Sequence, residues 1–123
     1  ALRAAVTSGD VHFFLGTDSA PHPVSQKESD MPPAGIFTAP AALELYAGVF
    51  EEEGKLENFE KFSSLNGPAF YELPPNKEKI TLKKKPWTLD ALVETGSLEK
   101  LRPFGYHENP TMRLAIQWKF AAY

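Results

Sequence analysis

An aspartate and a histidine follow a short apolar run and lie four positions apart. Residues 11–17 read VHFFLGT, Asp18 comes next, and His22 follows the turn-forming Ser-Ala-Pro. A carboxylate at the end of a strand can ligate a metal ion or act as a general base. An imidazole can ligate a metal, transfer a proton or, when protonated, bind a carboxylate. The same spacing also fits an aspartate that caps a turn and a histidine at the surface, so both interpretations stay open at this point.

The run over residues 11–17 predicts a strand. It lacks the polar alternation of a half-exposed strand, which is the pattern of a parallel strand buried on both faces. Residues 1–9, ALRAAVTSG, are typical of a helix end closed by Gly9. Helix and strand together form an α/β unit, as found in a Rossmann-like sheet or a TIM barrel. Both folds bind ligands at the carboxyl ends of their strands, where Asp18 lies.

A long loop is expected over residues 18–38. The segment holds four prolines and shows no helical or strand period. Loops of this length are uncommon in compact domains unless they are functional or disordered. The loop therefore favours a functional interpretation of Asp18 and His22.

Helical spacing of apolar residues predicts helices over about 40–53 and 56–65. Asn66-Gly67-Pro68 is expected to break the second helix. A short strand is predicted within residues 78–87, and alternating apolar residues predict another over 113–120. The chain is thus expected to form a single partial α/β domain over residues 1–123.

The other polar residues are interpreted as structural or solvated. His12 begins the predicted strand and should lie at the face opposite the site, while His107 is expected in an exposed turn. The lysines at 83–85 and the glutamates at 51–53 are short charge runs that most simply face water. The sequence contains no phosphate-binding glycine motif, nucleophile elbow or H-x-H pair.

Composition limits the class of protein. The chain has 123 residues, 42% hydrophobic and 24% charged, with a net charge of −3. That balance favours neither a nucleic acid nor an anionic membrane as partner, and no apolar run approaches the roughly 20 residues that span a bilayer. Cysteine is absent, which excludes disulfides and thiolate metal sites and agrees with a reducing, cytoplasmic location.

Several stretches together resemble one known family, the dihydroorotases of the single-function bacterial, plant and fungal type. The resemblance covers the C-terminal third of that family. Its motifs are FFLGTDSAPH (13–22), Lys27-Glu28, Ala34-Gly35, APAALELYAGVFEEEGKLENFEKF (39–62) and NGPAFYELPPNKEKITLKKKPW (66–87). It extends more loosely to the last predicted strand.

The resemblance implies a fold and an activity. Dihydroorotases are TIM (β/α)8 barrels of the metal-dependent hydrolase type, with a two-zinc site. They interconvert N-carbamoyl-L-aspartate and L-dihydroorotate, small-molecule substrates of de novo pyrimidine biosynthesis. Residues 11–17 would be the eighth barrel strand, followed by the active-site loop 18–38, the two helices and closing strands. Members often form homodimers.

Three site residues follow from the resemblance. Asp18 matches the aspartate that ligates zinc and shuttles the proton, His22 matches the residue that binds the substrate carboxylate, and Ala34 matches a position whose backbone contacts the substrate. Many relatives carry cysteines and a glycine where this chain has Asp30-Met31-Pro32-Pro33. Proline has no N–H, but Ala34 keeps its own, so the expected contact is preserved.

The family's remaining ligands lie upstream of anything in this chain. They are an H-x-H pair, a carbamylated lysine and two further histidines, and a whole barrel needs about 250 residues. We therefore expect these 123 residues to supply part of an active site and to be inactive without the upstream barrel segment. The alternatives are a noncatalytic barrel fragment or interaction module, and a related cyclic amidase of other specificity.

Overall fold

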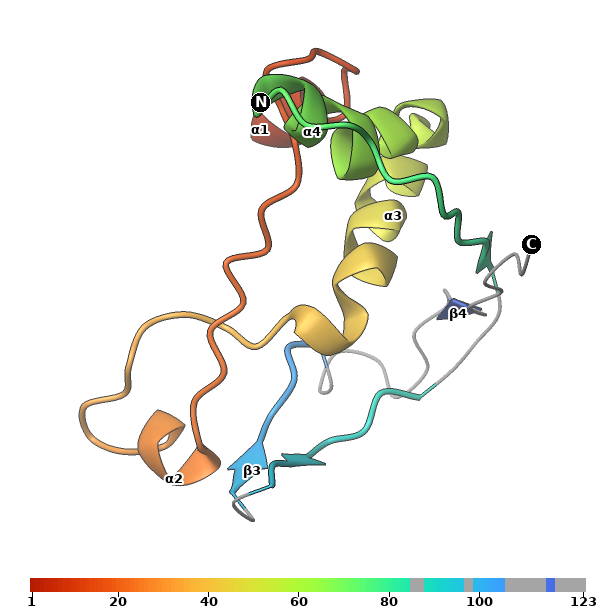
Figure 1. Cartoon of the computed structure of the whole chain (residues 1–123). Coiled ribbons are helices and arrows are strands. Elements are labelled where there is room, and N and C mark those ends of the chain that lie inside the picture. Colours follow the sequence, from red (N-terminus) through yellow and green to blue (C-terminus); the bar gives the residue numbers. More distant parts are fainter. Residues whose placement is uncertain (85–87, 97–98, 106–114, 117–123) are drawn as a thin grey trace. The chain divides into compact units, whose positions relative to one another are not determined.

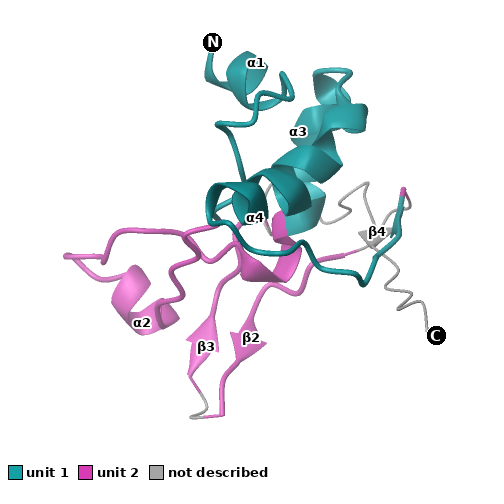
Figure 2. Cartoon of the chain, turned by 45° about the horizontal axis from the view of Figure 1, so that its top comes forward, with its two compact units in different colours: residues 1–16, 43–83, 116–123 teal, residues 17–42, 84–115 magenta. Residues whose placement is uncertain are grey.

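The computed structural model describes residues 1–84, 88–96, 99–105 and 115–116. The chain groups into two compact units, coloured in Figure 2. Unit 1 comprises residues 1–16, 43–83 and 116–123, and unit 2 comprises residues 17–42 and 84–115. The single partial domain expected from the sequence stays a prediction.

Helices dominate unit 1, with α3 (Ala42–Glu52) the longest element in Figure 1. A 3-10 turn, Ala39–Ala41, leads into it, and a helix was expected over 40–53. The helix ends where Gly54 adopts a φ of +65°. There Gly54 N–H donates to Glu51 O and Lys55 N–H donates to Phe50 O, the bond pattern of a Schellman cap. The described residues of the unit also form α1 (Leu2–Val6), a 3-10 turn (Leu56–Asn58), a π-helix (Lys61–Leu65) and α4 (Asn66–Phe70).

Aromatic rings form the core of unit 1. The ring of Phe50 is fully buried, and its centroid lies 5.3 Å from that of Phe59 and 5.2 Å from that of Phe62. Tyr46, one turn earlier on α3, contacts Phe62 at 5.6 Å. Such tilted and edge-on pairs contribute beyond the area they bury, so these rings fix α3 against the helical segment that follows it.

The expected break at Asn66-Gly67-Pro68 is wrong, because the helical path continues to Phe70. Residues 61–65 form a π-helix, and a new α-turn begins directly after it at Asn66. Pro68 then falls in the first turn of α4, where a missing N–H costs no helical hydrogen bond. The side chain of Asn66 is buried and donates to the carbonyl oxygens of Asp10 at 3.2 Å and Phe13 at 2.9 Å.

The strand expected over residues 11–17 is also not formed. Residues 13–22 belong to no helix or strand. Leu15 N–H donates to Phe62 O at 3.0 Å, which ties the segment to a helix instead of a strand ladder. A buried parallel strand is defined by its neighbours on both sides, and the described residues supply no such neighbour. The part of the chain that the structure describes therefore shows no barrel strand.

The described part of unit 2 contains the loop and a small antiparallel strand pair, the hairpin. The loop contains one helical turn, α2 (Val24–Lys27). Strands β2 (Val93–Glu94) and β3 (Lys100–Leu101) pair antiparallel, with Val93 opposite Leu101. Leu101 also forms a bridge with Pro23, and Phe104 N–H donates to Phe37 O at 2.8 Å. The hairpin therefore contacts the loop at two separate places.

A second small sheet pairs β1 (Leu82–Lys83) with β4 (Ala115–Ile116). These two elements lie within the strands expected over 78–87 and 113–120, whose other residues include some outside the described ranges.

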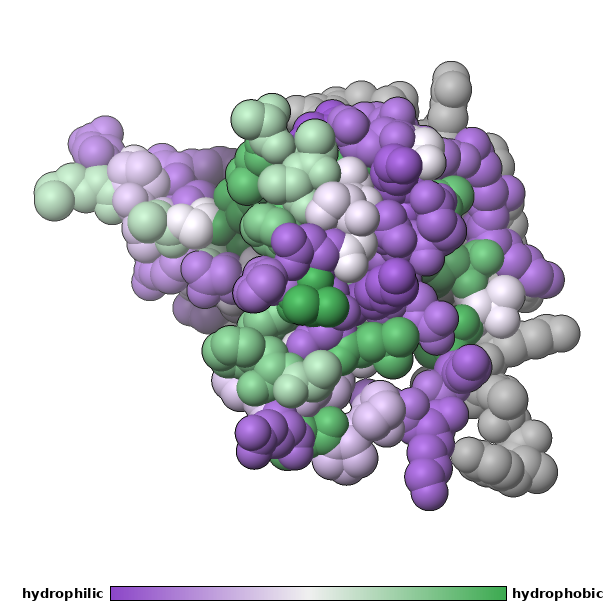
Figure 3. Space-filling view, turned by 90° about the horizontal axis from the view of Figure 1, so that it is seen from above, coloured by the Kyte–Doolittle hydropathy of each residue, from purple (hydrophilic) through white to green (hydrophobic). Residues whose placement is uncertain are grey.

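The surface mixes apolar and polar groups, as the face in Figure 3 shows. Large exposed side chains include Phe70 and Tyr71, which contact each other and Phe14. In the described residues no helix combines the length and apolar character that a membrane span requires.

We predict that Asn66→Ala destabilises the protein that carries this chain. The change leaves two carbonyl groups without their donor, and an unsatisfied buried group costs about 1 to 3 kcal/mol. Urea unfolding should show that loss, whereas Asn76→Ala, at an exposed position, should leave the free energy of unfolding within about 0.5 kcal/mol. Equal effects of the two substitutions would contradict the bridging role of Asn66.

Candidate active site

The two ends of the long loop are fastened together at Ser19 and Ala20. Ser19 Oγ accepts hydrogen bonds from the N–H groups of Thr38 at 3.1 Å and Ala39 at 3.0 Å. Ala20 N–H donates to Ile36 O at 2.9 Å. Ser19 thereby also provides an acceptor for N–H groups at the start of the helical segment that begins at Ala39. The loop thus leaves and returns at one place.

Gly35 lies close to Ala20 within this closure. Its φ is +99°, a region that side chains rarely adopt, and a Cβ there would lie 2.4 Å from Ala20 Cβ. Only glycine fits this position without displacing Ala20. Ala34 precedes Gly35, and Ala20 is two residues from both Asp18 and His22. The close contact therefore places the segment that carries Ala34 against the segment that carries Asp18 and His22.

Asp18 adopts a φ of +44°, one of two non-glycine residues with positive φ among those described. Aspartate tolerates this left-handed region better than most residues, and such backbone is often found at functional sites. The side chain is exposed. No hydrogen bond or ion pair engages its carboxylate within the described residues, so both oxygens are available to a ligand.

His22 is half-buried and lies between two prolines, Pro21 and Pro23. The bridge of Pro23 to Leu101 holds the backbone directly after it. No described residue forms a hydrogen bond with the ring. A held backbone and an available imidazole suit a residue that binds an anionic ligand when protonated.

Sequence reasoning missed two residues that shape the loop. Ser19 closes the base of the loop through its hydroxyl oxygen. Lys27 Nζ donates to Pro33 O at 2.6 Å and to Gly35 O at 2.7 Å, on either side of Ala34. The neighbouring Glu28 forms an ion pair with Arg102 at 3.2 Å. The only sequence signals were the position of Ser19 beside Asp18 and the presence of Lys27 in the family resemblance.

The chain is similar in sequence to dihydroorotases of several organisms, although no family model matches it. It is 62% identical over 87 residues to the mitochondrial dihydroorotase of Arabidopsis thaliana, covering 71% of this chain and 23% of that protein. It is 59% identical over 97 residues to the dihydroorotase of Vibrio cholerae (79% and 28%), and 50% identical over 119 residues to that of Hahella chejuensis (97% and 32%). The chain is related to the dihydroorotases.

Solved dihydroorotases are also its structural neighbours. The crystal structure of dihydroorotase in complex with 5-fluoroorotic acid from Saccharomyces cerevisiae matches with a TM-score of 0.88 and 32% identity, over 98% of this chain and 34% of that one. The dihydroorotase of Campylobacter jejuni matches with a TM-score of 0.77 and 29% identity, over 94% and 33%. The resemblance predicted from the sequence is confirmed. The matches span 23% to 34% of the length of these dihydroorotases, in their C-terminal part.

The other polar candidates lie outside this dihydroorotase-like loop. His12 is exposed, and its Nδ1 lies 2.6 Å from Asp10 Oδ1. Hydrogen bonds from the His12 backbone N–H and from its ring lower the pKa of Asp10. Since both groups are exposed, the pair has the features of a local turn contact. His107 and Lys85 lie outside the described residues.

The glutamates at 51–53 differ from the expectation that they simply face water. Glu52 and Glu53 both form ion pairs with Arg3 of α1. Their carboxylates raise the pKa of Arg3, chiefly through the hydrogen bond with Glu52. The charge run therefore links two helices of unit 1, although the exposure of these side chains keeps the energetic contribution small.

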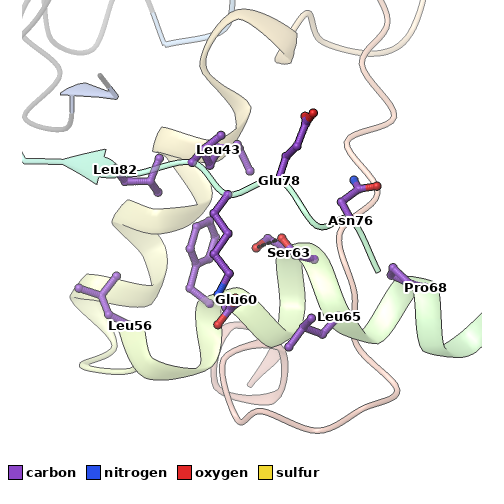
Figure 4. A pocket seen from close by; sticks show the side chains of 13 residues that line it. Leu43, Leu56, Glu60, Ser63, Leu65, Pro68, Asn76, Glu78 and Leu82 are labelled. Carbon is purple, nitrogen blue, oxygen red and sulfur yellow. Dashed lines mark hydrogen bonds and ion pairs between the residues drawn. The ribbon is translucent and has the colours of Figure 1, made fainter. Parts of the chain in front are cut away.

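A metal centre is not complete in the part of the chain that the structure describes. No three His, Cys, Asp or Glu side chains there could hold an ion together. A groove of about 520 Å³ in unit 1, shown in Figure 4, is lined by Leu43, Leu56, Glu60, Ser63, Leu82 and others. Asp18, His22 and Ala34 are not among its lining residues. Asp18 therefore remains a single candidate ligand within the described residues.

We predict that Gly35→Ala loosens the loop and that Gly54→Ala does not. Both glycines have positive φ, but a Cβ at Gly54 meets nothing within 4 Å. Displacement of Gly35 should free Lys27 from its carbonyl partners and accelerate trypsin cleavage after it. A loss of 1 to 2 kcal/mol corresponds to about 5-fold to 30-fold faster cleavage. Mass spectrometry of timed digests would measure this, and equal rates for both variants would refute the importance of the Ala20 contact.

Proposed function

We propose that this chain supplies part of the active site of a dihydroorotase. Such an enzyme interconverts N-carbamoyl-L-aspartate and L-dihydroorotate, a reversible cyclic amide hydrolysis in pyrimidine biosynthesis. The observation that carries the proposal is the 50–62% identity to dihydroorotases across most of the chain. The yeast relative was solved with 5-fluoroorotic acid, a carboxylated ring that agrees with a site for a cyclic, anionic substrate.

The proposed fold of the complete enzyme is a TIM barrel of the metal-dependent hydrolase type. In it, residues 11–17 would gain strand neighbours and become the eighth barrel strand. Support comes from the match to the solved dihydroorotase of Saccharomyces cerevisiae, with a TM-score of 0.88 over 98% of this chain. Asp18 would then lie at the carboxyl end of the strand, where barrel enzymes place their catalytic groups.

Asp18 is proposed as metal ligand and proton carrier. Its exposed carboxylate, without a partner among the described residues, fits a hard or borderline cation such as zinc. When bound, two zinc ions would supply a hydroxide near neutral pH. Most of their ligands would come from the part of the enzyme outside this chain. During ring opening, an Asp18 carboxylate oxygen would accept a proton and return it to the departing ring nitrogen.

His22 and Ala34 are proposed to bind the substrate carboxylate. A protonated imidazole and a backbone N–H are both donors suited to an anion. Support comes from the contact of Gly35 with Ala20, which holds the segment of Ala34 close to the segment that carries His22. Two donors on the carboxylate would orient the ring and present its amide bond to the reacting groups.

The enzyme would need the upstream barrel segment to complete its active site. A homodimer is proposed as its assembly, because dihydroorotases often form homodimers. A cytoplasmic location is proposed from the absence of cysteine, while one relative is named a mitochondrial enzyme.

We predict that Asp18→Asn abolishes turnover in the complete protein that carries this chain. The amide cannot accept a proton and is a weaker ligand, so dihydroorotate hydrolysis should fall by at least about 100-fold. The measurement is kcat with bound zinc determined in the same samples. Asp30→Asn, at another exposed position of the loop, is the matched control and should retain activity.

Near-normal kcat for Asp18→Asn would rule out the proton-carrier role. A wild-type protein with neither zinc nor turnover would instead favour a noncatalytic barrel protein, and turnover of other cyclic amides alone would indicate a related amidase.

A further inference from the structure

Lys27 makes an unusual pair of contacts inside the loop. Its side chain extends from α2 to two carbonyl oxygens, those of Pro33 at 2.6 Å and Gly35 at 2.7 Å. Both are short hydrogen bonds from a charged donor, which are about twice as strong as neutral ones. The residue is half-buried. The ammonium therefore holds the peptide group that precedes Ala34 and the one that follows Gly35.

The geometry of the peptide unit links Lys27 to the N–H of Ala34. The carbonyl of Pro33 and the N–H of Ala34 belong to the same planar peptide group, in which a trans bond points them in opposite directions. An ammonium that fixes the carbonyl oxygen on one side therefore fixes the direction of the N–H on the other side. The same hydrogen bond polarises the peptide and makes its N–H a better donor.

We propose that Lys27 is a positioning residue that aims and strengthens the Ala34 N–H as a donor to the substrate carboxylate. This inference rests on the proposed function of the chain. Lys27 acts through the backbone of Ala34 and does not touch the substrate. Its positive charge behind the peptide also favours an anion in front of it.

The other contacts of the loop are independent of Lys27. Ser19 and Ala20 close the base of the loop through residues 36–39. The pair between Glu28 and Arg102 and the bridge between Pro23 and Leu101 hold the region of α2 against the hairpin. Loss of the ammonium therefore leaves the loop closed and releases chiefly residues 33–35. A purely structural role would be expected to affect the whole loop.

The test is steady-state kinetics of Lys27→Met in the complete protein. Methionine keeps an unbranched side chain but lacks the charge and the N–H donors. We expect KM for dihydroorotate and the inhibition constant of orotate to rise about 10-fold, with kcat changed less than about 3-fold and bound zinc unchanged. Lys27→Arg keeps the cation and should recover part of the affinity. Gln26→Met, at an exposed position of the same helical turn, is the matched control and should retain the wild-type KM.

Each outcome decides the proposal. Wild-type KM and orotate inhibition in Lys27→Met would overturn it while leaving the proposed function intact. A parallel fall of kcat, zinc content and thermal stability in both Lys27→Met and Lys27→Arg would also overturn it, because that is the result of a damaged loop. A wild-type protein that neither turns over dihydroorotate nor binds orotate would overturn the proposed function, and this inference with it.

Discussion

The candidate site depends on the closure of one loop at Ser19 and Ala20. Loop length alone is a small obstacle, since each doubling adds only about 0.6 kcal/mol of closure entropy. The larger requirement is that two distant segments meet in one fixed arrangement. Three contacts meet that requirement. The Ser19 hydroxyl accepts hydrogen bonds from two N–H groups, the Ala20 N–H donates to Ile36 O, and Gly35 packs against Ala20. Asp18 is bonded directly to Ser19, so the group with the proposed chemistry is adjacent to the closure.

The same closure explains why small residues occupy these positions. Ala20 contacts the position where Gly35 lacks a side chain, so a larger residue at either place would separate the two segments. Ser19 must be short to reach the N–H groups of Thr38 and Ala39 while its own backbone follows that of Asp18. The Ala-Gly pair noted in the sequence therefore has a mechanical reason, because Gly35 provides the space and Ala34 the backbone N–H that the proposed chemistry requires.

The sequence predicted helices, which depend on local signals, better than strands, which depend on pairing with residues distant in the chain. The helix expected over 40–53 corresponds to Ala42–Glu52 because apolar spacing and Gly54 are local signals. The expected break at Pro68 was wrong. A π-helix ends at Leu65 and α4 begins at Asn66, so Pro68 lies in the first turn of a helix and not in a helix interior. The expected strand over 11–17 needed neighbours that local patterns cannot supply. Asp18 and His22 could be singled out from the sequence because they are polar residues that follow an apolar run. The role of Lys27 could not, because it depends on which backbone carbonyl groups its side chain reaches, and every residue has such a group.

An exposed carboxylate and a closed loop explain why the chemistry has to be shared with other parts of a larger site. Asp18 alone cannot hold a zinc ion, which takes four ligands in most protein sites, and a single exposed ligand in water competes poorly with solvent. In the proposed enzyme, the loop would orient the anionic substrate through His22 and the Ala34 N–H, whose backbone is held by contacts within unit 2. Substrate orientation would then be the task of this segment, and activation of water would depend mostly on residues outside it. That division agrees with a chain spanning about a third of the related dihydroorotases.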